Sequence, residues 1–385
     1  MDIYDELLRW AKGEGVELFG IEPRRIPGRG IGVVATKDIQ KDDRILHVPT
    51  TTLRAIETVP KHITKNFPKD ARVHGLLAAD LALETLSPTS KYAAWNAVVP
   101  SQSDIFATLP LAWDPALHPF LPPPALSLVQ KQLAKFALDH ASFQTSLPSL
   151  PSSPTVPRDT YLYTWLLTNT RTFYFETPRT LRLRLPRDDR MVLQPVADLF
   201  NHAAAGCAVS FDAASFTITA DRPYAAGDEV YICYGQHSND FLLAEYGFVL
   251  EENGWDEVGL DEAVLAELDG KQRERLEERG FLGGYVLDAD TVCYRTQVAL
   301  RLLCVPLREW RRFVDGGVGE GEEAAQAKVD RLLVKILRRY LVKIDGTLET
   351  LSTLEVGEVG QREMLSMRWQ QIRGLVDKTI MGLES

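Results

Sequence analysis

The hydrophobic pattern of this chain changes character three times along its length. Residues 28–49 hold short β-branched segments bounded by glycine and proline, whereas residues 50–160 repeat apolar side chains at the spacing of an amphipathic helix. Strand-like alternation returns at 191–234, and helical spacing resumes beyond residue 250. Strands and helices that fall in separate blocks of one chain are typical of an α+β fold.

The order of these blocks predicts two domains. The first, 1–250, contains the strands and a helical insertion at about 60–160, and the second, 251–385, is helical. Helices are expected at 3–13, 73–81, 128–140, 261–279, 289–310, 324–343 and 347–380, and strands at 28–35, 45–49, 209–211, 216–220 and 229–234. The last three strands are expected to form an antiparallel meander.

Three segments are expected to lack helices and strands. The proline run 122–124 and the segment 147–157, with a proline at every third position, are expected to be extended. The acidic, glycine-rich stretch 315–323 is expected to be a solvated loop between two helices.

Charge and cysteine content limit the partners and the compartment. The 385 residues carry 43 Lys and Arg against 53 Asp and Glu, a net charge of −10, which argues against direct nucleic-acid binding and favours a basic protein partner. No stretch reaches the roughly eighteen apolar residues of a membrane span, and the amino-terminal residues include acids where a signal peptide has Lys and Arg. The four cysteines follow no regular spacing, so we expect reduced thiols in the cytoplasm or the nucleus.

A glycine motif near the amino terminus allows two interpretations. Gly28, Gly30 and Gly32 form a GxGxG, but a dinucleotide-binding fingerprint needs a strand before it and a helix after it, and here a β-branched segment follows. A glycine-rich β turn, which lets backbone amides approach a ligand closely, is the favoured interpretation.

Histidine and cysteine pairs raise a zinc site as an alternative. His202 with Cys207 and Cys233 with His237 would give a Cys2His2 set. The first pair lacks the spacing of a zinc finger, and Cys233 lies within a β-strand pattern. We therefore expect no metal site.

Polar and aromatic residues concentrate between Pro195 and Leu250. A buried Asn or Tyr costs about 1–3 kcal/mol unless its polar atoms are hydrogen bonded, so a cluster of them indicates a functional site. The cluster contains Asp198, Asn201, His202, Tyr224, Tyr231, Tyr234 and Tyr246.

Five short motifs follow one another along the chain. They are Arg29-Gly30-Ile31-Gly32, Arg171-Thr172-Phe173, Asp198-Leu199-Phe200-Asn201-His202, the GDEVYICYG of 227–235, and Tyr246-Gly247-Phe248. In letters, order and spacing they resemble those of the SET-domain protein-lysine methyltransferases, and within them the branch of the Rubisco large-subunit methyltransferase. The resemblance covers nearly the whole chain. It implies short β-sheets with a knot-like threading of the carboxyl-terminal SET segment, a helical insertion and an all-α C-terminal domain that binds the substrate.

The resemblance implies S-adenosylmethionine as the cofactor. In the family, a glycine turn and an Asn-His pair bind this cofactor and an arginine lies near its methionine part. The family's threading would bring positions 29, 171, 202, 234 and 246 together. The cofactor-binding residues it implies here are Arg29, Gly30, Ile31, Gly32, Arg171, Asn201, His202 and Tyr234.

The resemblance also implies a channel for the substrate lysine. Lysine has a pKa of about 10.4 in water and must lose its proton before it attacks a methyl group. A narrow apolar channel lowers this pKa by desolvation, and a tyrosine hydroxyl can orient the neutral amine. By position, Tyr246 is the catalytic residue, and Asp198, Tyr234 and Phe248 line the channel. Without the resemblance, Tyr246 would be taken for a core aromatic.

The sequence departs from the family pattern in two places. Ala203 replaces the serine that usually follows Asn-His, and the cysteine-rich segment of many histone methyltransferases is absent, so 251–385 would close the channel or dock the substrate. A relative in this branch methylates histidine and lacks the tyrosine of the Tyr-Gly-Phe motif, so Tyr246 favours lysine. The expected substrate is a basic ribosomal protein or translation factor, with a histone as the alternative. A SET-like scaffold without turnover is the rival interpretation.

Overall fold

The chain forms two compact units in a computed structural model that describes residues 3–86, 90–151, 153–289, 291–317 and 321–384. None of the helices in these ranges combines the length and hydrophobicity that a membrane-spanning segment requires. Unit 1 comprises Met1–Ala112, Val129–Gln236 and Glu245–Gly247, and unit 2 comprises Trp113–Leu128, His237–Ala244 and Phe248–Ser385.

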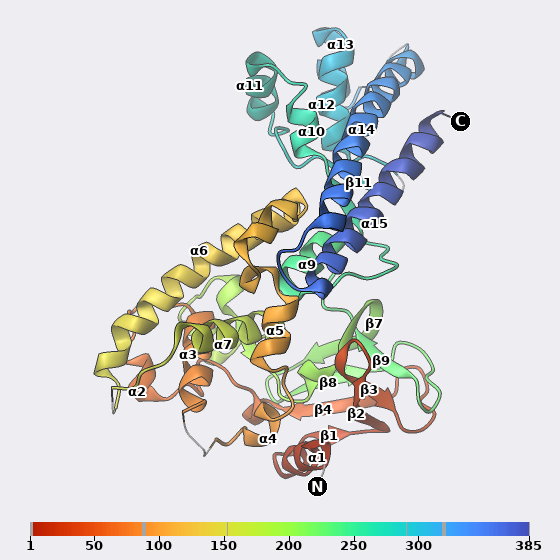
Figure 1. The fold of residues 1–385 in the computed structure, drawn as a ribbon. Helices are drawn as coiled ribbons and strands as arrows, with labels where there is room; N and C mark the ends of the chain where they lie inside the picture. The colour runs from red at the N-terminus through yellow and green to blue at the C-terminus, as the bar shows by residue number, and fades with distance from the viewer. Residues whose placement is uncertain (1–2, 87–89, 152, 290, 318–320, 385) are drawn as a thin grey trace. The chain divides into compact units, whose positions relative to one another are not determined.

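Unit 1 is built on a seven-stranded sheet whose strands come from both β-rich blocks of the sequence (Figure 1). Its strands are β1 (Glu17–Leu18), β2 (Ile21–Ile26), β3 (Gly30–Ala35), β4 (Arg44–Pro49), β7 (Asn201–Phe211), β8 (Ser215–Thr219) and β9 (Glu229–Ile232). Across the sheet they follow the order β1-β4-β8-β7-β9-β3-β2. A separate pair, β5 (Thr172–Tyr174) and β6 (Met191–Leu193), is antiparallel.

The expected antiparallel meander is wrong in its last strand. β7 and β8 pair antiparallel, but β9 pairs with β7 in parallel and has β3 as its other neighbour. Alternation of apolar and polar residues identifies a strand but not its neighbours, so the parallel pairing could not be predicted. β7 also begins at Asn201, well before the expected start at 209. The parallel pairing sets Asn201 opposite Tyr231 and His202 opposite Ile232.

The glycine motif forms the turn of a hairpin between β2 and β3, as the favoured interpretation predicted. Gly28 and Gly30 adopt φ angles of 75° and 74°, which glycine tolerates because it has no Cβ. β2 was not predicted, since it contains Pro23, which cannot donate a ladder hydrogen bond. The strand lies at the edge of the sheet, where proline is tolerated.

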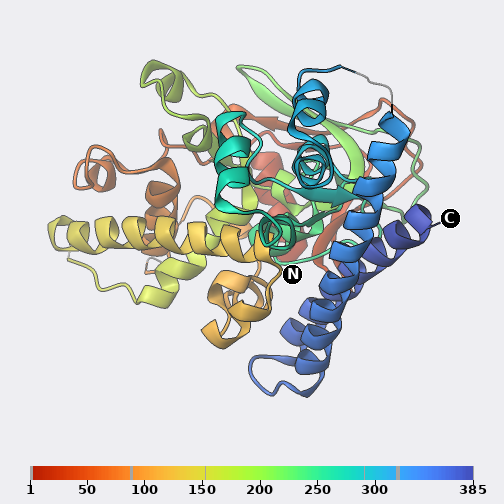
Figure 2. The same cartoon turned by 90° about the horizontal axis from the view of Figure 1, so that it is seen from above.

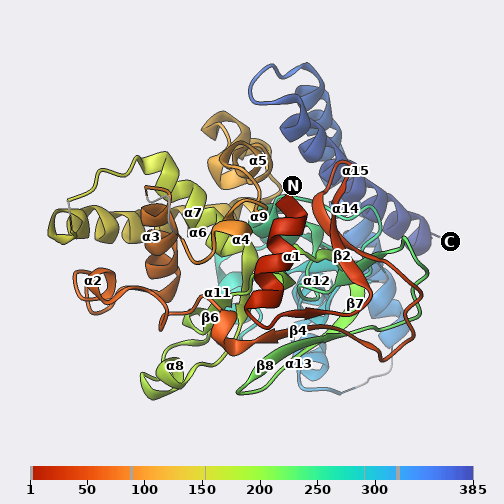
Figure 3. The ribbon, with the colours of Figure 1, turned by 90° about the horizontal axis from the view of Figure 1, so that it is seen from below.

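Helices pack around this sheet, and α1 (Ile3–Gly13) lies on one of its faces (Figures 1 and 3). The helices α3 (Val73–Glu84) and α7 (Arg158–Arg171) pack on each other, and α3 buries nine of its twelve residues. The other helices that begin before residue 250 are α2 (Lys61–Thr64), α4 (Ala93–Asn96), α5 (Gln102–Thr108), α6 (Pro123–Ser146), α8 (Pro178–Arg182) and α9 (Asn239–Tyr246). The part of α6 up to Leu128 and the part of α9 up to Ala244 belong to unit 2. Short 3-10 turns occupy Thr50–Thr52, Pro110–Ala112, Pro115–Phe120, Leu147–Ser149, Arg187–Asp189 and Ala197–Leu199.

The expectation of an extended proline run at 122–124 is wrong. Pro123 and Pro124 are the first residues of α6, which is longer than the helix expected at 128–140. Proline fits the first turn of a helix because the backbone N–H groups there have no partner inside the helix. Of the expected extended segment 147–157, Leu147–Ser149 form a 3-10 turn and Ser152 lies outside the described residues.

Unit 2 is helical, as predicted, with a small two-stranded sheet of β10 (Glu257–Gly259) and β11 (Val286–Asp288) in addition. The helices α14 and α15 run side by side (Figures 1 and 2). The helices of this unit are α10 (Asp261–Leu265), α11 (Gly270–Glu278), α12 (Tyr294–Cys304), α13 (Leu307–Val314), α14 (Glu322–Thr353) and α15 (Val359–Glu384).

All four helices expected in this region have different bounds in the structure. The helix expected at 261–279 is two helices, because the Asp269 side chain caps a new helix at its N-terminus. The helix expected at 289–310 is also two, because Pro306 interrupts the hydrogen-bonding pattern. The break expected near 344–346 lies instead at 354–358, where Gly357 has a φ of 75°. Residues 318–320 of the expected acidic loop lie outside the described residues.

A buried ion-pair cluster lies in the core of unit 2. The Arg368 guanidinium on α15 donates to Asp240 and to Asp256, each at 2.6 Å, and the Arg368 side chain is fully buried. The Trp369 indole N–H donates to the Phe120 carbonyl at 2.7 Å. These contacts join segments that lie far apart in the sequence.

Candidate active site

A cavity of about 230 Å³ lies in unit 1, beside β5 and the end of β9. Cavities that enclose whole organic cofactors are usually larger, so this one fits an extended side chain better. Four residues expected at the site, Arg171, Asp198, Tyr234 and Tyr246, line it. The other lining residues are Thr170, Thr172, Phe173, Tyr174, Val209, Phe211, Phe216, Ile232 and Cys233.

Two tyrosines share one side of this cavity. The Tyr234 hydroxyl donates to the Phe200 carbonyl at 2.7 Å, and its ring lies 5.0 Å from the ring of Tyr246. Burial raises the pKa of Tyr246 to about 12 and raises that of Tyr234 well above its usual value. Both phenols are therefore neutral at physiological pH.

A buried carboxylate lies beside the tyrosines. The Arg171 guanidinium donates to the Asp198 side chain at 3.1 Å and to its backbone carbonyl at 2.7 Å. The Trp95 indole N–H donates to both carboxylate oxygens, at 3.0 and 3.2 Å. Burial raises the pKa of Asp198, and Arg171 and Trp95 oppose the rise. Sequence reasoning missed Trp95, because no local pattern around α4 indicates a contact 103 residues away.

A second polar cluster surrounds Glu229 on β9. Its carboxylate accepts hydrogen bonds from the Asn201 amide and the Tyr231 hydroxyl, each at 2.8 Å, and pairs with Arg29 at 2.7 Å. Gly32 is packed tightly here, because a Cβ at this position would lie 2.7 Å from Glu229 Oε1 and 2.8 Å from Asn201 Nδ2. Glu229 therefore joins the glycine hairpin to Asn201. The GDEVYICYG motif of 227–235 contains Glu229, and an acidic residue within a strand pattern is the sequence signal that could have identified it.

His202 lies next to both groups of residues. Its Nδ1 accepts a hydrogen bond from the Tyr234 backbone N–H at 3.0 Å, and the two rings lie 5.0 Å apart. Asn201 belongs to the Glu229 cluster, so consecutive residues of β7 connect that cluster to the cavity. The predicted channel residue Phe248 belongs to unit 2, outside the unit that contains this cavity.

Aromatic residues that sequence reasoning did not select as site residues also line the cavity, and the exposed ones, Tyr174 and Phe211, form its rim. Phe173 and Phe216 contact edge to face at 5.4 Å, and Phe211 lies 6.1 Å from Phe216 and 6.4 Å from Tyr174. Phe211 is 46% exposed and Tyr174 39% exposed, which is unusual for side chains of this size. The rim thus offers apolar surface to an incoming chain.

The residues weighed as a zinc site have other partners. Cys207 Sγ contacts Asp221 and Tyr224, and Cys233 Sγ contacts the carbonyls of Ala204 and Gly235. Within the described ranges, no three His, Cys, Asp or Glu side chains gather in a way that could hold a metal ion.

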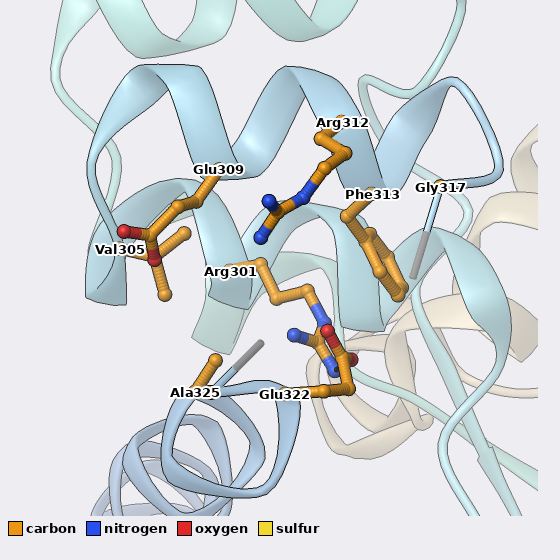
Figure 4. A pocket seen from close by; sticks show the side chains of 9 residues that line it. Arg301, Val305, Glu309, Arg312, Phe313, Gly317, Glu322 and Ala325 are labelled. Carbon is orange, nitrogen blue, oxygen red and sulfur yellow. Dashed lines mark ion pairs between the residues drawn. The ribbon is translucent and has the colours of Figure 1, made fainter. Parts of the chain in front are cut away.

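A second hollow, in unit 2, is much smaller (Figure 4). It lies among α12, α13 and the start of α14 and has a volume of about 10 Å³, which is room for roughly one water molecule. Arg301 beside it pairs with Glu322 at 2.7 Å and donates to Gln326. The cavity in unit 1 is therefore the stronger candidate for an active site.

Two family models match this chain. The model of the SET domain matches residues 30–235, more than half of the chain. A model described as the C-terminal domain of ribosomal lysine N-methyltransferase 2 matches residues 256–381.

Several individual proteins are similar in sequence to this chain over most of its length. SET domain-containing protein 4 of Mus musculus is 26% identical over 385 residues, which cover 94% of this chain and 86% of the relative. Ribosomal lysine N-methyltransferase set11 of Schizosaccharomyces pombe is 24% identical over 361 residues, 90% of each chain. A structure of Rubisco LSMT bound to sinefungin and monomethyllysine has a TM-score of 0.66 at 18% identity and covers 100% of this chain and 93% of its own. This last likeness concerns the fold.

Proposed function

Because this chain belongs to the SET-domain family, we propose that it transfers a methyl group from S-adenosylmethionine to the side-chain amine of a lysine in a protein substrate. The observation that carries the proposal is the cavity in unit 1. Two neutral tyrosines and the buried Arg171–Asp198 pair line this cavity, whose volume fits one extended side chain.

The residues expected to bind the cofactor fit its methionine part. The Asn201 amide donates to Glu229 through Nδ2, which leaves Oδ1 to accept from an ammonium group. Gly30 has a positive φ and open space around the position of a Cβ, so the backbone is accessible from that side. We assign cofactor binding to Arg29 through Gly32, Arg171, Asn201, His202 and Tyr234, with Glu229 holding Asn201 in place.

The two tyrosines would orient the substrate amine and form part of the cavity wall around it. The bound cofactor supplies a methyl group on a sulfonium, which an in-line displacement transfers. The apolar rim and the buried position favour the neutral form of a lysine that enters the cavity, because desolvation lowers the pKa of an amine. The Tyr246 hydroxyl, whose pKa of about 12 keeps it protonated, orients the amine nitrogen, and Tyr234 and Asp198 form the walls.

The proposed substrate is a basic protein, namely a ribosomal protein or a translation factor. We propose that the enzyme encounters it in the cytoplasm or the nucleus. The ribosomal methyltransferases among the relatives and the net charge of −10 support this proposal. We assign substrate binding to the C-terminal region 251–385, whose residues 256–381 match a ribosomal methyltransferase domain model. A histone is the alternative substrate.

Labelled S-adenosylmethionine and an extract that lacks this protein would test the proposal. We expect label on a lysine of one basic protein, identified by mass spectrometry, and cofactor binding by calorimetry.

Tyr246→Phe should reduce the rate of methyl transfer sharply or change the number of methyl groups added. Tyr163→Phe is the matched control, because the Tyr163 hydroxyl bonds to the Pro100 carbonyl outside the cavity lining. Failure to bind the cofactor would contradict the proposal and favour a scaffold, and label on histidine would contradict the assignment to lysine.

A further inference from the structure

The connection between β5 and β6 carries an unusual charge. This segment, 175–190, leaves the cavity at Tyr174, the last residue of β5, and returns at Met191, which pairs with Tyr174. It contains α8 (Figure 3). We call it the arginine arm, because it carries Arg179, Arg182, Arg184, Arg187 and Arg190.

Four of these five arginines have no carboxylate within ion-pair distance among the described residues. Within the part of the chain that the structure describes, Arg190 alone among the five is paired, with Glu176 at 2.5 Å. Two carboxylates close by have other partners: Glu57 accepts from the Thr177 hydroxyl and the Arg179 backbone, and Asp189 accepts from the Val73 backbone. Asp188 is the remaining acid of the segment. The four guanidinium groups of Arg179, Arg182, Arg184 and Arg187 are thus free to bind an external anion.

The arm is connected to the rim of the cavity. The Arg187 guanidinium lies over the Tyr174 ring, 5.2 Å from its centroid. Tyr174, Phe211 and Val209 are each more than a third exposed on that rim. Leu181 and Leu183 of the arm are about half exposed as well, which gives it apolar surface between its charges.

We propose that the chain segment carrying the acceptor lysine has acidic residues close to that lysine and apolar or aromatic residues next to it. The inference rests on the proposed function, since it assumes that the lysine enters this cavity. Residues flanking it would then lie over the aromatic rim and the arginine arm. Arginine recognises carboxylates through two parallel hydrogen bonds, so the arm selects for Asp and Glu.

A polyanion such as RNA is the competing occupant of a basic surface. The net charge of −10 opposes the approach of a nucleic acid. The four unpaired arginines of the arm would neutralise few phosphates, so they favour a short acidic segment over RNA. An acidic segment of a protein needs only local complementarity. A basic substrate protein can carry such a segment around its acceptor lysine, so the inference agrees with the proposed substrate class.

Two peptides would test the inference with the full-length protein. One is Glu-Glu-Phe-Lys-Phe-Glu-Glu, and the other has all four glutamates replaced by arginine; both carry a fluorophore for anisotropy. At about 50 mM salt, we expect the acidic peptide to bind about tenfold more tightly, and the difference to shrink as salt screens the charges. The double variant Arg182→Glu/Arg184→Glu should reverse the order. Lys61→Glu/Lys65→Glu makes the same change in charge at two exposed lysines at the ends of α2, outside the arm and the cavity lining, and should leave the order unchanged.

The remaining outcomes are distinct. Equal affinities, tighter binding of the basic peptide, no binding of either below about 1 mM, or tighter binding of a short oligouridine than of the acidic peptide would each overturn the inference. Calorimetry with S-adenosylmethionine on the same preparation separates the two failures. If the cofactor binds and the peptide preference is absent, only this inference is wrong, whereas loss of cofactor binding contradicts the proposed function.

Discussion

Trp95 and Asp198 form a buried hydrogen bond that recurs elsewhere in the same unit with different residues. The Trp95 indole N–H lies 3.0 Å from the nearer carboxylate oxygen of Asp198, and that of Trp165 lies 2.9 Å from Asp139. Both indoles are almost completely buried. Only Asp198 lines the cavity, so the second pair is a control for the first.

Replacement of Trp95 by Phe removes the indole N–H and leaves Arg171 as the remaining side-chain donor to the Asp198 carboxylate among the described residues. The pKa of Asp198, already raised by burial, should rise further because a group that stabilises the anion is lost. We expect a loss of about 1–3 kcal/mol in the free energy of unfolding and a shift of the acidic limb of the kcat/KM profile to higher pH. Trp165→Phe should lose similar stability without that shift, and equal profiles for the two variants would exclude a positioning role for Trp95.

The pH dependence of the reaction follows from the neutral Tyr246. Burial raises its pKa to about 12, so the hydroxyl keeps its proton throughout the range in which the acceptor amine loses one. Between about pH 7 and about pH 10, kcat/KM should rise as a lysine with a free pKa near 10.4 is deprotonated, and it should not fall again within that range. Initial rates in buffers of constant ionic strength would show this. A decline below about pH 10 that disappears in Tyr246→Phe would contradict the assigned state of the phenol.

The ion-pair cluster of unit 2 should be essential to its stability. Arg368→Met leaves Asp240 and Asp256 as buried carboxylates without their main partner, and the loss of one member of such a cluster costs about 3–5 kcal/mol. Arg373 on the same helix also contacts two carboxylates, Asp345 and Asp377, but is exposed to solvent. Urea unfolding followed by circular dichroism should show a much lower midpoint for Arg368→Met and little change for Arg373→Met. Similar midpoints for the two variants would contradict the role given to burial.

The sequence was most informative where chemistry is local. The glycine turn, the Asn201–His202 pair and the Tyr234 motif are short segments whose residue types reflect their own backbone and hydrogen bonds. Strand pairing is not local, so the parallel neighbour of β7 could not be deduced from alternation. Trp95 is the clearest case, because its partner lies in another block of the chain and an indole in a short helix resembles any core residue.

Glu229 should determine how well the cofactor binds. Its carboxylate accepts from Asn201 and Tyr231 and pairs with Arg29, while its side chain is only 9% exposed. Glu229→Gln has nearly the same shape but places an amide N–H₂ where one of these donors needs an acceptor, so the Asn201 amide should turn or lose its position. We expect the dissociation constant of S-adenosylmethionine to rise about tenfold, which corresponds to about 1.4 kcal/mol, in a calorimetric titration. Glu176→Gln is the matched control, because Glu176 also accepts from a tyrosine two residues away, Tyr174, and pairs with an arginine. Unchanged affinity in Glu229→Gln, or an equal loss in both variants, would show that Glu229 does not position Asn201 for the cofactor.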